Sequence, residues 1–170
     1  GAWQGPLGAD QILAQVDYLV RERHPDGAPS QPKLKIQFAR MGEPAFNPAV
    51  LQVLRELPAL YPSAGLLPSL STVAPVGCAP FFDDLVGIKD EFYGGGRFQL
   101  QFSIHTTDRA ARRRLIPVRC WSLAEMARYG ERFFRPGDRK VTLNFAACRD
   151  HPIEPDRIAD HFDPERFLIK

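Results

Sequence analysis

LKIQFARMGEPAFNPAVLQVLREL, residues Leu34 to Leu57, contains the sharpest change of pattern in the chain. Apolar and polar residues alternate over 33–39, which predicts a β-strand. A tight Gly-Glu-Pro turn follows, and the apolar residues after Asn47 recur at helical spacing until Pro58 and Pro62, which are expected to end the helix. The stretch therefore places an acid, Glu43, in a turn at the end of a buried strand.

The rest of the chain repeats this alternation. A helix is expected around residues 12–20, and further strands are expected at 65–72, 97–105, 140–147 and from 166 onward, with helices between them. Alternating strands and helices imply a largely parallel sheet. An eight-fold barrel takes about 250 residues, so a chain of this length that opens on a helix and ends on a strand is predicted to be a piece of a longer barrel or open sheet. We expect one domain over residues 1–170.

The composition is that of a globular domain. Hydrophobic residues make up 44% of the 170 residues and charged residues 25%, which allows a sizeable core. The formal net charge of +2 is no nucleic-acid footprint by itself, but it does not exclude an RNA substrate. No apolar run reaches the roughly 20 residues of a membrane helix, and no signal peptide is visible.

The three cysteines, Cys78, Cys120 and Cys148, are widely spaced. They form no zinc or iron–sulfur motif within this chain and are interpreted as small core residues. Their odd number favours a reducing, cytoplasmic setting.

Polar residues collect at the predicted carboxyl ends of the strands, where parallel α/β folds bind ligands. In chain order they are Met41, Gly42, Glu43 and Pro44, then Ser71 and Thr72, then Ser103 and His105 with Ile104 between them, and finally Asn144 and Cys148. A glycine lets a ligand approach the backbone closely, and a carboxylate can accept hydrogen bonds from an ammonium group. These residues are therefore the candidates for a binding site.

Each candidate also has a purely structural interpretation. Glu43 can cap the helix that follows it or face the positive amino end of that helix. The two serines can bond to nearby backbone, and His105 can bond to a neighbouring loop instead of acting as an acid, a base or a ligand contact. The basic segment Asp108–Arg114 can be a solvated helix face or a contact for phosphate or RNA.

Four segments, in one order, resemble the adenine-methylating branch of the radical S-adenosylmethionine (SAM) enzymes, which includes rRNA and tRNA adenosine methyltransferases and antibiotic-resistance relatives. The segments are MGEPAFNPAVLQVLREL, LSTVAPVG, FSIHTTDRAARRRLIPV and VTLNFAACRDHPIEPDRIADHF. The family has a G-E-P turn, an L-S-T-S-G strand, an S-L-H-A strand followed by V-P-I, and a V-T-[IL]-E strand at similar spacing. The resemblance covers nearly the whole chain. It implies an α/β fold: a partial (βα)6 barrel, incomplete and TIM-like, that is truncated at both ends here.

The resemblance also implies a site. By position, Gly42 and Glu43 match the turn that binds the amino group of SAM, and Ser71 matches a serine that contacts SAM from the next strand. Ser103, Ile104 and His105 match the segment that lines the SAM pocket. LSTVA stands where the family has L-S-T-S-G, and Asn144 stands in place of an acid.

The C-x-x-x-C-x-x-C motif that holds the family's [4Fe–4S] cluster is absent from this chain. The opening GAWQGPLGADQILAQV resembles the residues that directly follow that motif. The resemblance therefore implies a cluster in the parent protein, with its ligands upstream of Gly1 and no metal ligand within these residues.

The implied activity is that of a radical SAM enzyme. An electron donor would reduce the cluster, the cluster would convert SAM to a 5′-deoxyadenosyl radical, and RNA adenine would be a candidate for methylation. The piece alone is expected to be inactive. Two other hypotheses stay open: a cluster-less scaffold that binds RNA or a protein partner through Arg109 and Arg112–Arg114, and a SAM-independent enzyme with Glu43 and His105 as acid and base.

Overall fold

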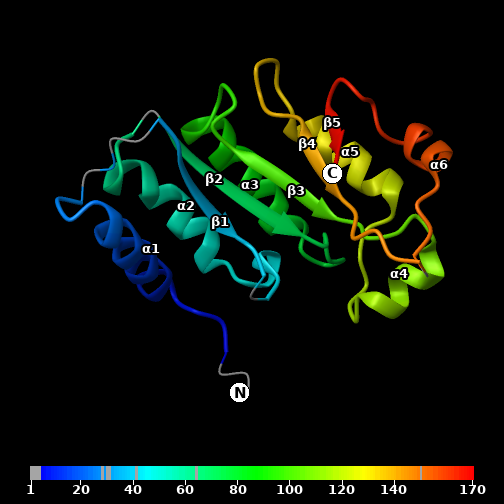
Figure 1. Cartoon of the computed structure of the whole chain (residues 1–170), viewed down its shortest axis with the longest axis horizontal. Coiled ribbons are helices and arrows are strands. Elements are labelled where there is room, and N and C mark those ends of the chain that lie inside the picture. The colour runs from blue at the N-terminus through cyan, green and yellow to red at the C-terminus, as the bar shows by residue number, and fades with distance from the viewer. Residues whose placement is uncertain (1–4, 28, 30–31, 41, 64, 150) are drawn as a thin grey trace.

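The structure is a computed structural model that describes residues 5–27, 29, 32–40, 42–63, 65–149 and 151–170. All five expected strands are confirmed, and Met41 and residues 1–4 lie outside the described residues. The elements in chain order (Figure 1) are α1 (Ala9–Arg23), β1 (Leu34–Phe38), the 3₁₀ turn η1 (Pro44–Phe46), α2 (Ala49–Leu60), β2 (Leu66–Thr72), α3 (Ala79–Phe92), β3 (Gln99–Ser103), α4 (Arg109–Leu115), α5 (Leu123–Phe133), β4 (Val141–Asn144), α6 (Pro155–Ala159) and β5 (Phe167–Ile169).

The strands form one parallel sheet in the order β1-β2-β3-β4-β5, so each strand pairs with the next one along the chain. This order, without a reversal, is the winding of barrel-type α/β folds, whereas doubly wound sheets reverse direction at a switch point. Within the described residues β1 and β5 are the two edges of the sheet. The parallel α/β fold is therefore confirmed, and the partial barrel stays a prediction.

The two faces of the sheet differ in chemistry. One face carries Leu70, Phe102 and Leu143 at neighbouring positions, and all three are fully buried. Phe102 meets the ring of Tyr129 on α5, so this face packs against the helices. The residues of the opposite face are mostly polar: Lys35, Gln37, Ser69, Ser71, Gln99, Gln101, Ser103, Thr142 and Asn144.

Side-chain hydrogen bonds cross this polar face from strand to strand. Gln101 Nε2 donates to Ser69 Oγ at 2.9 Å, and Gln99 Nε2 donates to Thr142 Oγ1 at 2.9 Å. Buried or half-buried polar groups need such partners. The sheet thus has an apolar face that packs against the helices and a polar face that extends to the carboxyl ends of the strands.

Two buried tyrosines connect the helices that cover the sheet. Tyr129 Oη on α5 donates to the carbonyl of Phe82 on α3, and Tyr93 Oη after α3 donates to the carbonyl of Leu54 on α2. The expected end of α2 at Pro58 is wrong, because the helix continues to Leu60. Proline lacks the N–H that would bond to the carbonyl four residues earlier, which is that of Leu54. The Tyr93 hydroxyl satisfies this carbonyl instead.

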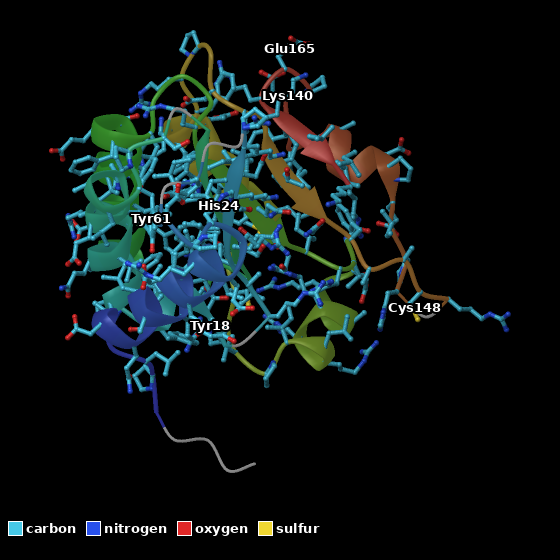
Figure 2. All side chains as sticks on the ribbon, turned by 60° about the vertical axis from the view of Figure 1, so that its left-hand side comes forward. Tyr18, His24, Tyr61, Lys140, Cys148 and Glu165 are labelled. Carbon is cyan, nitrogen blue, oxygen red and sulfur yellow. The ribbon has the colours of Figure 1, made fainter. Side chains whose placement is uncertain are left out.

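Of the three cysteines that were interpreted as core residues, Cys78 packs against the core and the other two do not. Cys78 and Cys120 are half-buried, and Cys148 is exposed at the outer end of the segment between β4 and α6 (Figure 2). No described helix is long and apolar enough to cross a membrane.

Candidate functional site at the carboxyl edge of the sheet

Three residues with left-handed backbones stand at equivalent places along the carboxyl edge. Arg40, Ala74 and His105 each follow the last residue of β1, β2 or β3 by two positions, and their φ angles are 75°, 55° and 66°. Non-glycine residues adopt positive φ at a cost, and such strain gathers at functional sites. The edge where the sequence places its candidates is therefore also where the backbone carries this strain.

Glu43 is held by three hydrogen bonds. Its Oε1 accepts from the hydroxyl of Thr72 (2.5 Å) and from the backbone N–H of Ala45 (3.1 Å), and its Oε2 accepts from the backbone N–H of Val73 (2.9 Å). The carboxylate caps η1, not the longer α2, where Asn47 Oδ1 accepts from the N–H of Ala49 instead. Glu43 thereby joins the loop after β1 to the end of β2.

Gly42, directly before this acid, has a φ of 83°, a conformation that side chains rarely adopt. A Cβ added there would meet no atom within 4 Å, and the residue is exposed. The turn therefore leaves open space beside the backbone at Gly42, where a ligand can approach.

Arg112 connects the hydrogen bonds around Glu43 to the segment between α4 and α5. Its guanidinium donates from Nη2 to the carbonyl of Val73 at 3.1 Å and from Nη1 to the carbonyl of Trp121 at 2.7 Å. Burial lowers the pKa of Arg112, and Nε has no partner among the described residues. The segment after β2, which contributes Val73, is thus fixed by Glu43 on one side and by Arg112 on the other.

Ser71 and Ser103 lie on the polar face, Ser71 one residue before the end of β2 and Ser103 at the end of β3. Ser71 is aligned with Gln101, and Ser103 lies two residues beyond Gln101 on the same face. Ser103 is in turn aligned with Asn144 on β4. The register therefore brings both serines to one side of the sheet near its carboxyl edge, as the sequence hypothesis requires.

Ile104 and His105 lie just beyond β3, not within it as expected. Their backbone N–H groups both donate to the carbonyl of Asn144, at 2.9 and 3.1 Å. Ile104 is fully buried, so the structure does not expose it to a ligand. His105 is half-buried, and its Nδ1 is a buried polar atom without a partner among the described residues.

The stability of the protein should therefore depend on the protonation of His105. Burial lowers the pKa of this imidazole below its ordinary value, and the positive charges of Arg112 and His151 lower it further. The folded state therefore favours the neutral imidazole of His105. Because protonation of this ring is easier in the unfolded chain, the free energy of unfolding falls as the pH drops below about 6.5, the ordinary pKa of histidine. In His105→Asn, which tolerates a positive φ, the free energy of unfolding should decline less steeply between about pH 6.5 and pH 5.

Urea unfolding across this pH range checks the expectation, with His161→Asn as a control for the loss of an exposed imidazole. An unchanged slope in His105→Asn would contradict it.

No metal centre is built from the described residues, since no group of three or more histidine, cysteine or acidic side chains lies close enough together to hold an ion. The thiols are also poorly suited as ligands, because burial raises the pKa of both Cys78 and Cys120.

Sequence reasoning did not foresee how two residues hold the edge in place. Thr72 was a binding-site candidate, yet it is buried on the helix side of the sheet, and its hydroxyl supports Glu43. Arg112 looked like part of a solvated basic helix, yet its guanidinium is bonded to two loop carbonyls. The arginine run offered no signal that distinguishes Arg112 from its neighbours.

Taken together, these observations define an α/β protein with a parallel sheet, whose carboxyl strand ends carry the candidate ligand-binding residues. Among its relatives are the proteins named probable dual-specificity RNA methyltransferase RlmN from Synechococcus sp. (strain CC9311), 27% identical over 169 residues, and from Rhodococcus opacus (strain B4), 31% identical over 163 residues. These matches cover 94% and 92% of this chain and 45% and 42% of the relatives. The chain therefore spans less than half the length of the curated relatives it matches.

A third relative, from Prochlorococcus marinus (strain MIT 9303), carries the same name and is 26% identical over 164 residues. No family model and no solved structure matches the chain. The resemblance to the RNA adenine-methylating branch of radical SAM enzymes is confirmed by these relatives.

Proposed function

We propose that this chain is the central part of a radical SAM enzyme that methylates RNA, and that its carboxyl edge binds SAM. The observation that carries the proposal is the position of Glu43. In the sequence it lies in the family's G-E-P turn, and in the structure its carboxylate stands at the strand ends beside the open space at Gly42.

The residues present fit SAM. Glu43 Oε2 accepts one hydrogen bond, from Val73, and so keeps acceptor capacity for the ammonium group of the methionine moiety. The hydroxyls of Ser71 and Ser103 lie on one face of the sheet, where they can bind the carboxylate or the ribose. The Nδ1 of His105, which has no partner among the described residues, is a further polar group at the same edge.

The described residues do not fit a [4Fe–4S] cluster, which needs a set of cysteine thiolates. We therefore assign no part of the cluster chemistry to the residues of this chain. The ligands of the cluster and its electron donor would belong to the rest of the parent protein. There, the cofactors supply the radical chemistry, and the residues of this chain bind and orient SAM.

Calorimetric titration of the parent protein with SAM tests the proposal. We expect saturable binding, and about 10-fold weaker binding in the double variant Ser71→Ala/Ser103→Ala, since each lost neutral hydrogen bond is worth about 0.5–1.5 kcal/mol. Ser69→Ala is the matched control, because Ser69 lies on the same face but deeper in the sheet and accepts from Gln101. Absence of SAM binding would reject the radical SAM enzyme and leave the scaffold and the SAM-independent enzyme as the alternatives.

A further inference from the structure

A cleft of about 950 Å³ is lined by residues of α4, of the segment that connects α4 to α5, of the start of α5 and of α6. α6 lies above α4 in Figure 1, and Arg157 Nη1 on α6 donates to the carbonyl of Thr107 just before α4. The charged side chains that line the cleft are Arg109, Arg112, Arg113, Arg119, Arg157 and Glu125. In a chain whose formal net charge is only +2, five arginines around one hollow are a marked local concentration of positive charge.

Two of these arginines have structural partners. Arg112 is bonded to backbone carbonyls, and Arg157 forms an ion pair with Glu154 at 2.5 Å. The other three, Arg109, Arg113 and Arg119, are exposed, and no carboxylate of the described residues forms an ion pair with them.

Glu125, the single acid among the described residues of the lining, forms no ion pair with these three arginines. Its carboxylate accepts from the backbone N–H and the hydroxyl of Ser122, both at 2.7 Å, and so completes the capping box of α5. Three guanidinium groups therefore have no acidic partner among the described residues and can bind an external anion, and guanidinium groups bind phosphate through two parallel hydrogen bonds.

The cleft and the candidate SAM site share a wall. Arg112, which lines the cleft, donates to the carbonyl of Val73, and the backbone N–H of Val73 donates to Glu43. An extended polyanion in the cleft would therefore run next to the carboxyl edge. Exposed apolar side chains at the rim, Val76 and Val118, offer contacts to bases as well.

We propose that this cleft binds the sugar–phosphate backbone of an RNA strand through Arg109, Arg113 and Arg119, next to the site where the RNA reacts. The proposal rests on the proposed function for the identity of the polyanion. Its experimental consequence is a salt dependence, because each phosphate contact releases counterions from the RNA.

The test is fluorescence anisotropy with a fluorescein-labelled RNA stem-loop, measured on the parent protein at several KCl concentrations. In the variant Arg109→Gln/Arg113→Gln/Arg119→Gln, the slope of log affinity against log salt should become shallower by about two to three, with weaker binding at every salt concentration. The corresponding triple lysine variant should keep the slope, because it keeps the charges.

The matched control is Arg23→Gln/Lys33→Gln/Arg55→Gln, which removes the same charge from exposed positions on α1, before β1 and on α2. An equal loss in this control, or an unchanged slope in the cleft variant, would overturn the proposal. Displacement of the RNA by polyglutamate as effectively as by unlabelled RNA would also overturn it, in favour of an acidic protein partner.

SAM calorimetry on the same preparations, without RNA, separates this inference from the proposed function. If SAM fails to bind while the salt slope still depends on the three arginines, the cleft is an RNA site and the proposed function is wrong. If SAM binds and the slope does not depend on the three arginines, the cleft proposal alone is wrong.

Discussion

Replacing Glu43 by glutamine is expected to weaken SAM binding by about 10- to 100-fold, because a hydrogen bond to a charged group is worth about 1.5–3 kcal/mol. The carboxylate offers the ligand ammonium an acceptor of opposite charge. Glutamine removes the charge and replaces one oxygen by a donor. Whichever way the amide is placed, its NH₂ group faces the backbone N–H of Ala45 or of Val73, both of which now donate to the acid.

The loss could also arise because the loop after β1 moves, so the experiment needs a ligand that separates the two causes. 5′-Methylthioadenosine keeps the adenosine moiety of SAM and lacks the amino-acid part. If Glu43 binds the ammonium, Glu43→Gln weakens SAM and leaves the affinity for 5′-methylthioadenosine close to that of the wild type.

Thr72→Val is the matched variant, because it removes only the hydroxyl that supports Glu43 and leaves the charge in place. It should therefore weaken SAM much less than Glu43→Gln. Unchanged SAM affinity in Glu43→Gln would contradict the assignment and favour an enzyme that does not use SAM.

The strands of this fold could be predicted because their patterns are local. The alternation around Ile36 specifies one strand by itself, and that strand is present. Pro58 misled the prediction because the loss of its N–H is compensated by Tyr93, which lies 35 residues away in sequence and contacts α2 only in the folded chain. A compensation of this kind cannot be read from the local sequence.

The site divides in the same way. Its candidate residues could be found because strand ends of a parallel sheet share one edge, and because the segments resemble a family. The hydrogen bonds that hold these residues in place could not be predicted, because they depend on tertiary contacts. Val73, for example, donates to Glu43 through its N–H and accepts from Arg112 through its carbonyl. Whether a hydroxyl faces the helices, as that of Thr72 does, or the polar face, as that of Ser71 does, depends on a register that shifts with a single residue.

Replacing Lys89 by methionine should lower the free energy of unfolding by about 3–5 kcal/mol, the cost of leaving a buried partner charge uncompensated. The side chain of Lys89 on α3 is 1% exposed and that of Asp138 is 6% exposed, and Nζ and Oδ2 are 2.7 Å apart. Asp90 lies at 2.5 Å on the other side, and the ring of Phe133 lies 5.1 Å from Nζ. Methionine fills the same space but leaves both carboxylates without this cation.

The pair lies at the amino ends of the strands, because Asp138 precedes β4 and also accepts from the N–H of Gly96 before β3. Denaturant unfolding measures the loss, with Lys33→Met as the exposed control. Adding Asp138→Asn to Lys89→Met should restore part of the stability, since it removes the uncompensated charge and keeps an acceptor for Gly96. A loss within the roughly 1 kcal/mol of a surface pair would show that water reaches the pair. The candidate site lies at the carboxyl ends of the strands, which is the opposite end from the Lys89–Asp138 pair. The SAM affinity of the folded variant should therefore stay unchanged, because stability and binding depend on different ends of the same strands.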